Sequence, residues 1–252
     1  MGDRTISLDA LERLPAADLI KWAASKYPKS FAVVTSFQSE GMVLLDMAAR
    51  VLPSVRVVTI DTGRLPQTTL QMIDTIRERY GVAVEVVDPD PAEVAAMVSQ
   101  HGRDLFYREV PLRLICCEIR KVRPLERKLR ELDAWAVGLR RSQAESRGEV
   151  RKVEDVDGRL KLSPLADWTV AQVESYVLEH DVPRHPLYAL GYTSIGCDPC
   201  TRAVEAGEEE RAGRWWWEEG TPKECGLHFS PNGNAERKVD VLLREIVQTP
   251  HG

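Results

Sequence analysis

The sequence predicts an α/β fold in which a parallel, twisted sheet is flanked by helices. Short apolar runs alternate with longer amphipathic stretches through the first 140 residues, and this alternation is typical of parallel sheets. The chain has 252 residues, of which 43% are hydrophobic. It can therefore bury a full core as one α/β domain, with at most a small appendage. We find no internal repeat.

Each expected element follows from a local pattern. Short runs rich in Val, Ile and Ala predict buried parallel strands, and longer amphipathic stretches predict helices. In chain order we expect a helical cap at 10–24, a strand at 31–35, a helix at 41–50, a strand at 55–60, a helix at 65–80, a strand at 82–87, helices at 91–101 and 123–133, and a short strand at 135–138.

Beyond residue 140 the alternation weakens. The charged, Gly-containing stretch 146–160 is expected to be an exposed, mobile segment. A helix restarts over 164–180, with Asp167 as a cap before Thr169. The remaining expectations are a loop-rich stretch at 183–200, a helix at 200–210, and one amphipathic helix from residue 234 onward in a mobile C-terminal tail.

The composition limits the classes of function. A net charge of −5 argues against a nucleic-acid partner, since affinity for nucleic acids depends on Lys and Arg. No apolar run reaches the length of a membrane span, and no signal-peptide core follows the first residues, so we expect a cytoplasmic protein. Between residues 108 and 147, however, eleven Lys and Arg stand against six Asp and Glu. This local excess favours a small anionic ligand.

Two turns at expected strand ends are candidate ligand sites. The first contains Ser36, Phe37, Gln38 and Ser39 and leads into a helix, whose N-terminal N–H groups could bind phosphate. The second is Asp61-Thr62-Gly63, where a carboxylate or hydroxyl could bind a ribose and the glycine permits a tight backbone turn. Each has a plainer interpretation: the first as a helix cap, the second as a tight turn.

Five cysteines form the most informative pattern. Cys116 and Cys117 are adjacent, Cys197 and Cys200 are two residues apart, and Cys225 stands alone. Two clusters of thiolates can together bind one metal centre. Adjacent cysteines suit an iron–sulfur cluster, with its separate iron corners, better than zinc. Buried small hydrophobic residues and a redox-active pair remain alternatives.

The basic residues and the lone thiol add a second kind of chemistry. Lys121 lies one helical turn after Cys117, so the two should share a side. Guanidinium groups bind phosphate and sulfate oxygens well, and the candidates are Arg140, Arg141, Arg211 and Arg214. A nucleophilic thiol needs a neighbour that stabilises its thiolate. His228 could do this for Cys225.

At these residues the sequence resembles the assimilatory phosphosulfate reductases, specifically the iron–sulfur adenylylsulfate (APS) reductases of bacteria. The similar segments occur in the family's order over nearly the whole chain. They are 35–40, 61–63, 116–122, 138–143, 191–201, 211–217 and 224–228.

The resemblance implies a fold like that of the adenine nucleotide α-hydrolases and a division into a nucleotide- and cluster-binding domain, 1–215, and a C-terminal segment, 216–252, that carries the catalytic cysteine. It implies that Cys116, Cys117, Cys197 and Cys200 bind one [4Fe-4S] cluster per subunit. Cys225 would attack the sulfate sulfur of adenylylsulfate and release AMP. A thiol, typically that of thioredoxin, would then release sulfite in a pathway to cysteine.

The same resemblance suggests that Lys121, Arg140, Arg141, Arg211 and Arg214 reduce the repulsion between the thiolate and the anionic substrate. Related enzymes that use 3′-phosphoadenylylsulfate generally lack the cluster cysteines, so adenylylsulfate is the favoured substrate. The first turn lacks the Gly-Gly and Asp of the ATP pyrophosphatases, which argues against ATP cleavage.

Several alternatives remain at this point. They are a dual-specificity reductase, a zinc-stabilised nucleotide-binding module in which Cys225 is incidental, and a nucleotidyl-transfer enzyme. A homo-oligomer is compatible with the sequence. One departure from the family is His185 before Pro186, where Asn is more common.

Overall fold

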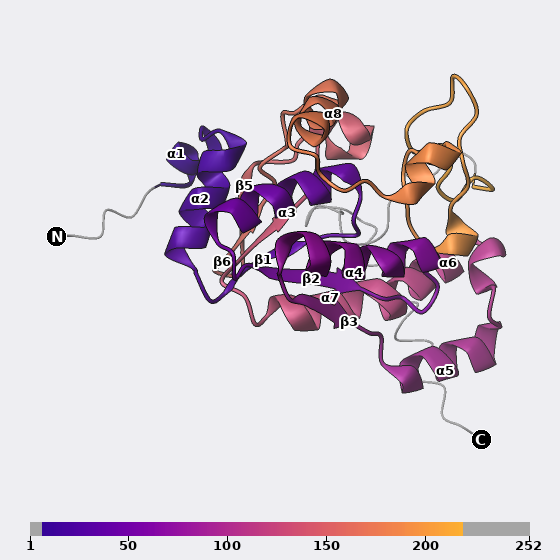
Figure 1. Ribbon diagram of the computed structural model, residues 1–252. Helices are drawn as coiled ribbons and strands as arrows, with labels where there is room; N and C mark the ends of the chain where they lie inside the picture. The colour runs from indigo at the N-terminus through magenta and orange to yellow at the C-terminus, as the bar shows by residue number, and fades with distance from the viewer. Residues whose placement is uncertain (1–6, 219–252) are drawn as a thin grey trace.

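A six-stranded sheet forms the centre of the computed structural model, which describes residues 7–218 (Figure 1). The strand order is β3-β2-β1-β4-β6-β5. All neighbouring pairs are parallel except β5 and β6, which are antiparallel. The strands are β1 (Phe31–Val34), β2 (Arg56–Ile60), β3 (Val84–Val87), β4 (Ala134–Val137), β5 (Val153–Val156) and β6 (Arg159–Leu162). The predicted α/β class and its parallel core are confirmed.

Helices connect the parallel strands and cover the sheet. The α-helices are α1 (Leu8–Glu12), α2 (Ala16–Lys26), α3 (Ser39–Val51), α4 (Gln67–Tyr80), α5 (Pro91–His101), α6 (Val110–Cys117), α7 (Arg123–Leu129) and α8 (Val170–Glu179). Short turns of other helix types are η1 (Leu105–Tyr107), η2 (Glu118–Val122), η3 (Arg141–Gln143), η4 (Glu145–Arg147), η5 (Pro186–Leu190) and η6 (Asp198–Cys200).

Alternating side chains of the strands divide the core into two layers. Phe31 and Val33 of β1 belong to the large core shared with α2, α3, α4 and α8, whereas Ala32 belongs to a smaller core with Leu129 and Leu132 beside α7. Figure 1 shows α3 and α8 above the sheet and α7 below it. This arrangement follows from the two-residue period of a strand buried on both faces.

The end of β1 is the point at which the chain changes direction across the sheet. β1 pairs with β2 on one side and with β4 on the other. In open α/β sheets, ligands bind beyond the carboxyl ends of strands at such a point. Gly138, just after β4, permits a close approach here, because a Cβ at this position would lie 2.8 Å from Cβ of Glu40 in α3. The loop after β4 therefore contacts the first turn of α3.

The stretch 146–160 is not the exposed, mobile segment that we expected. It contains most of η4, strand β5 and the start of β6. In the sheet, β6 lies next to β4 and β5 forms the edge. β5 and β6 form a hairpin around Asp157 and Gly158, which have φ angles of 53° and 78°. An Asp-Gly pair favours this kind of tight hairpin turn. The signal was present in the sequence, but the charged residues around it obscured the alternation.

The ends of several helices also differ from expectation. The N-terminal helical cap is split at Pro15 into α1 and α2, since proline ends a helix and favours the start of the next. Helix α8 begins after Thr169, whose side chain forms a capping box with Gln172; Asp167 instead pairs with Lys152 at 2.8 Å. The expected helix at 200–210 is absent from the described structure, which has irregular turns there. Helix α6 was not anticipated.

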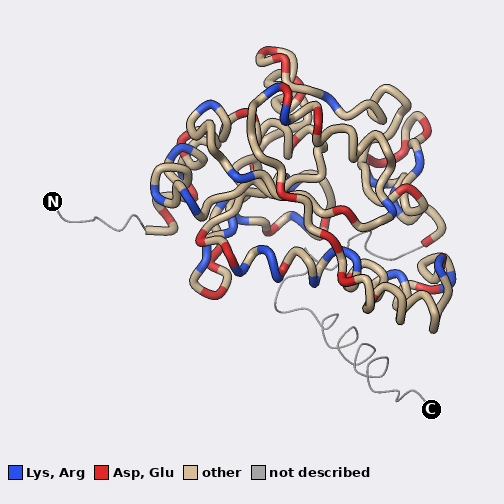
Figure 2. The backbone as a smooth tube through the Cα atoms, turned by 60° about the horizontal axis from the view of Figure 1, so that its bottom comes forward, with Lys and Arg blue, Asp and Glu red and all other residues tan. Residues whose placement is uncertain are grey.

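The surface charges are mixed over the described chain. Figure 2 shows Lys and Arg interspersed with Asp and Glu along the tube. Within residues 7–218, no helix is both long and apolar enough to cross a membrane. The helix expected from residue 234 lies outside the described residues, as does all but the start of the segment 216–252.

Candidate functional site

One large cavity, of about 1040 Å³, opens at the carboxyl ends of β1 and β4. Its walls include the turn between β1 and α3, the loop after β4, the C-terminal end of α6 and the irregular chain from 193 to 215. It also extends along the sheet face beside α7. Both candidate chemistries of the sequence, the oxyanion-binding residues and the four cysteines, therefore border the same space.

The first turn of α3 presents polar groups to this cavity. Ser39 is the first residue of the helix, and its backbone N–H donates to the Tyr188 hydroxyl at 3.1 Å. The Ser39 hydroxyl is buried, lines the cavity and has no hydrogen-bond partner among the described residues. Gln38 accepts a hydrogen bond from the N–H of Ile195 at 2.8 Å, which joins the turn to the opposite wall. Ser36 lines the cavity as an exposed residue.

Phe37 shapes this turn from within the core. Its φ of 61° is left-handed, and its N–H donates to the Thr35 hydroxyl at 2.9 Å. Its ring is 1% exposed and packs in the large core, so it does not line the cavity. Phe37 thus fixes the backbone that presents Ser36 and Gln38, and it makes no contact with the ligand space itself.

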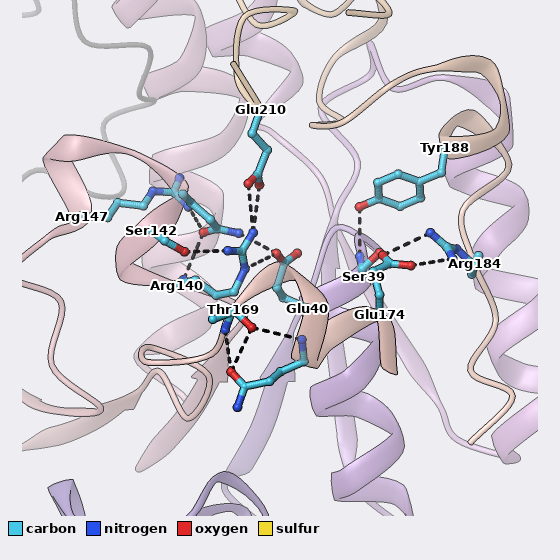
Figure 3. Close-up of polar contacts among 12 residues, drawn as sticks. Ser39, Glu40, Arg140, Ser142, Arg147, Thr169, Glu174, Arg184, Tyr188 and Glu210 are labelled. Carbon is cyan, nitrogen blue, oxygen red and sulfur yellow. Dashed lines mark hydrogen bonds and ion pairs between the residues drawn. The ribbon is translucent and has the colours of Figure 1, made fainter. Parts of the chain in front are cut away.

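Arg140, just after β4, is held by two carboxylates (Figure 3). Its Nε donates to Glu40 at 2.7 Å, and its Nη2 donates to both oxygens of Glu210 at 3.0 and 3.1 Å. Its Nη1 donates to the Ser142 hydroxyl at 2.8 Å. Gln143 also donates to Glu40, at 2.9 Å. The Arg140 side chain is 2% exposed, so this cluster fixes its guanidinium at the cavity wall.

The four cysteines of the two pairs gather at the other end of the cavity. Cys200 belongs to an apolar cluster with residues of α5, α6 and Trp215, and the other three pack against it. Burial raises the pKa of the Cys116 thiol to about 11 and that of Cys200 to about 12. An apolar setting of this kind disfavours a free thiolate and keeps these thiols unreactive until a cationic partner binds. The Cys197 sulfur lies 3.2 Å from the Thr62 hydroxyl.

A π-helical turn, η2, follows Cys117 directly. Turns of this kind are rare in proteins overall, but those that occur often lie at functional sites. The extra residue in the turn changes which side chains share a face of the helix. Cys116, Cys117, Arg120 and Lys121 all line the cavity. Arg120 is 8% exposed and donates to the Thr62 carbonyl at 2.8 Å, which joins η2 to the turn after β2.

Arg214 lies across the loop that carries the second cysteine pair. A Cβ on Gly196 would be 2.5 Å from Cζ of Arg214, so only glycine leaves room for the guanidinium there. The same guanidinium lies 4.5 Å from the ring centre of Trp215, and Arg113 lies 4.4 Å from that ring. The Arg214 charge lowers the pKa of Cys200, against the effect of burial.

The last described residues are anchored at this end. Glu218 pairs with Arg113 of α6 through two hydrogen bonds of 2.8 and 2.9 Å, and both side chains are buried. Trp215 has a φ of 42° and donates its backbone N–H to the Cys200 carbonyl at 3.2 Å. A left-handed conformation is costly for a bulky residue, so the surrounding contacts must maintain it.

A profile of the phosphoadenosine phosphosulfate reductase domain matches residues 30–203. The chain belongs to this family. Adenosine 5′-phosphosulfate reductases from Allochromatium vinosum and Burkholderia cepacia are 45% and 44% identical to it. The first alignment covers 80% of this chain and 81% of that protein, and the second covers 84% and 82%. The family assignment makes the protein an oxidoreductase.

Two solved structures share the fold. Phosphoadenylyl-sulfate reductase from Candida auris, in a phosphate complex, aligns with a TM-score of 0.64 at 26% identity and covers 81% of this chain and all of that one. FMN adenylyltransferase from Candida glabrata aligns with a TM-score of 0.52 at 17% identity and covers 99% of this chain and 86% of its own. The second likeness shows the fold alone.

Not every residue predicted for the site reaches the cavity. Ser36, Gln38, Ser39, Thr62, Lys121, Arg140, Arg211, Arg214 and the four paired cysteines line it. Asp61 instead accepts the Gly63 N–H at 2.8 Å and closes the turn, as the plainer interpretation held. Arg141 donates to the Val150 carbonyl and faces Glu12 and Asp167 outside the cavity. Cys225 and His228 lie outside the described residues.

Sequence reasoning missed several residues of the cavity wall in this reductase. Tyr188, Glu210 and Gln143 carry much of its hydrogen bonding, yet none stands in a pattern that singles it out. Gln143 falls inside a segment that resembles the family. For Tyr188 and Glu210, we find no signal in a single sequence that could have placed them here.

Proposed function

We propose that this protein reduces adenylylsulfate to sulfite and AMP with electrons from thiols, as a step of sulfate assimilation. The observation that carries the proposal is that one cavity joins a four-cysteine cluster to a fixed guanidinium and the first turn of α3. The named relatives, which include an adenosine 5′-phosphosulfate reductase from Rhizobium meliloti that is 39% identical, act on this substrate by name.

The cysteine end suits a [4Fe-4S] cluster. No three or more His, Cys, Asp or Glu side chains among residues 7–218 are grouped so that they could bind a single metal ion. A four-iron cluster binds each thiolate at a separate iron, so its ligands need not meet at one point. Two buried N–H groups nearby, Trp215 Nε1 and Arg214 Nε, have no partner among the described residues. Cluster sulfurs accept hydrogen bonds from such donors.

The cluster, when bound, would fix the geometry of the cysteine end of the cavity next to the substrate. Residues of the chain itself would bind the substrate and stabilise the charge that develops on it. Arg140 would hold an oxygen of the phosphosulfate, and Lys121, Arg211 and Arg214 would stabilise the negative charge that develops on the leaving phosphate. The Ser39 hydroxyl is a free donor at the α3 N-terminus, where the helix dipole also favours an anion. Arg141 faces away and has no part in this scheme.

The two electrons would come from two thiols. The Cys225 thiolate, stabilised by His228, attacks the sulfate sulfur; a sulfur–sulfur bond forms, the bond from sulfur to the phosphate oxygen breaks, and AMP leaves. A donor thiolate then attacks the Cys225 sulfur, and sulfite leaves with the electrons of the sulfur–sulfur bond. A second donor thiol releases Cys225 as the donor is oxidised to its disulfide. A dithiol of the thioredoxin type fits this requirement.

The remaining aspects of the proposal rest on the sequence. A cytoplasmic location keeps the five thiols reduced, and the reductase could act as a homo-oligomer. Use of 3′-phosphoadenylylsulfate is the second candidate, because the Candida auris structure is of a reductase named for that substrate.

The test is the intact mass of anaerobically purified protein after incubation with each nucleotide in the absence of reductant. We expect one sulfonate adduct from adenylylsulfate and none with the Cys225→Ser variant. Adducts from both nucleotides would establish dual specificity. No adduct on protein that contains its cluster would refute the mechanism, and an adduct on the Cys225→Ser variant would assign the nucleophile elsewhere.

A further inference from the structure

Arg140 forms ion pairs with two carboxylates, although one would be enough to balance its charge. Glu40 alone would neutralise the charge of the guanidinium. Glu40 is also firmly held: it lies in the first turn of α3, is buried, and accepts a second hydrogen bond from Gln143. Glu210 is the second carboxylate, and it binds the guanidinium through both oxygens. Both oxygens accept from the same nitrogen, Nη2, and a phosphate or sulfate oxygen could accept from that nitrogen in their place.

The two carboxylates are supported differently. Glu40 is fixed by a helix and by the close approach of Gly138. Glu210 comes from the irregular chain between the bridge residues Thr201 and Arg214, and its carbonyl accepts the Thr193 hydroxyl at 2.6 Å. Its side chain is 31% exposed, against 11% for that of Glu40. Of the two, Glu210 is the one that can leave without disturbing a regular element.

Electrostatics also weaken the hold of Arg140 on Glu210. Burial raises the pKa of the Glu210 carboxyl, and the negative charge of Glu40 raises it further, although Arg140 and Arg211 lower it. Because the net shift is upward, the ionised carboxylate is less stable here than in water. A contact of this kind is readily exchanged for another anion of better fit.

We propose that Glu210 is a resident counter-anion of Arg140, which an incoming oxyanion of the substrate displaces from Nη2. The identity of that oxyanion, the phosphosulfate of adenylylsulfate, rests on the proposed function; the displacement itself does not. Glu40 stays in place and keeps the guanidinium oriented. Glu210 thereby sets the affinity of the cavity for anions: it keeps Arg140 ordered in the empty state and competes with the ligand.

The proposal predicts that removing the charge of Glu210 should strengthen the binding of an anion, although most mutations in a binding site weaken it. In the Glu210→Gln variant the amide keeps the shape and one acceptor but loses the charge. We expect adenylylsulfate to bind about fivefold more tightly, because a neutral hydrogen bond to Arg140 is weaker than a charged one. The measurement is titration calorimetry of the cluster-containing protein, with Cys225→Ser in every sample so that no turnover occurs.

Glu209→Gln is the matched control, since it removes the same charge from the same loop at an exposed side chain. We expect it to leave the affinity within about twofold of the parent. If Glu210→Gln binds adenylylsulfate equally well or more weakly, or if Glu209→Gln strengthens binding as much, the proposal is wrong.

Inorganic phosphate is the second probe on the same variants. If the parent binds no adenylylsulfate, the proposed function fails, and tighter binding of phosphate by Glu210→Gln than by Glu209→Gln still supports the displacement. If the parent binds adenylylsulfate but Glu210→Gln does not bind it more tightly, the proposed function stands and the displacement is refuted.

Discussion

Arg140 at one end of the cavity and Arg120 and Arg214 at the other have different kinds of partner. At the α3 end, Arg140 is saturated by carboxylates, one of which comes from an irregular loop. At the cysteine end, Arg120 donates to a backbone carbonyl and Arg214 lies against Gly196 and the Trp215 ring, and neither pairs with a carboxylate of residues 7–218. The first arrangement can exchange one anion for another. The second leaves two guanidinium charges unpaired with carboxylates near the cysteine thiols, where they would stabilise the thiolates of the proposed cluster.

The largest effect on activity should come from replacing one of the four paired cysteines. In Cys197→Ser we expect loss of the visible absorbance of the cluster and a fall in sulfite formation of more than about 100-fold, since even groups behind metal ligands matter by about 10- to 100-fold. Anaerobic absorption spectra and a sulfite assay measure the two effects. Cys225→Ser is the control, which should lose activity and keep the absorbance. A Cys197→Ser protein with normal absorbance would remove this residue from the ligand set.

Variants of Arg140 and Arg141 should test the α3 end of the cavity without affecting the cysteine end. Arg140→Lys should weaken adenylylsulfate binding by about 10- to 100-fold, because lysine cannot reproduce the paired hydrogen bonds. The cluster absorbance should not change. Arg141→Lys is the matched control, since Arg141 faces Glu12 and Asp167 outside the cavity. Calorimetry with both variants decides the matter: equal losses would contradict the placement of Arg141 seen here.

The smallest effect concerns His185, which positions the Tyr188 side of the cavity. The His185 side chain accepts the Leu187 N–H at 3.2 Å, and its other ring nitrogen lies 2.9 Å from the Thr69 hydroxyl. Asparagine could cap Leu187 in the same way but could not also bond Thr69. We expect His185→Asn to lower the free energy of unfolding by about 1 kcal/mol at pH 7.5, measured by urea titration.

The same variant should alter the pH dependence of stability. Burial lowers the pKa of His185 below its usual 6.5, so below pH 6.5 the unfolded chain gains a proton that the folded chain does not. The wild-type protein therefore loses stability as the pH falls from 7.5 towards 5.5. His185→Asn should lose less over this range. An equal loss in both proteins would exclude His185 as the source.

Much of the scaffold could be predicted because apolar runs dominate it. Strands β1 to β4 follow from runs such as Phe31–Val34, whose burial leaves little choice of structure. The α-helices between them, with the exception of α6, follow from amphipathic stretches. The β5–β6 hairpin was missed because its residues are charged, although Asp157-Gly158 marked the turn. A single sequence also does not reveal the orientation of neighbouring side chains, so Arg140 and Arg141 were equivalent until the loop after β4 was seen.

The four paired cysteines were the easiest part of the candidate site to predict and the basic residues the hardest. Thiol spacing is itself a constraint, whereas the role of an arginine depends on its partners from distant segments. Glu40 and Glu210 are 100 and 70 residues away from Arg140 in the chain. The π-helical turn after Cys117 also lacks a recognisable pattern in the sequence.

The buried pair of Arg113 and Glu218 limits where the remaining chain can go. Cys225 is seven residues beyond Glu218 in the sequence, so its Cα stays within about 25 Å of that anchor, whatever path the chain takes. A tether of this length turns a bimolecular encounter into an intramolecular one, with an effective concentration in the millimolar range. For the nucleophile proposed here, the anchored Arg113–Glu218 pair would therefore act as the fixed point of a short tether to the cysteine end of the cavity.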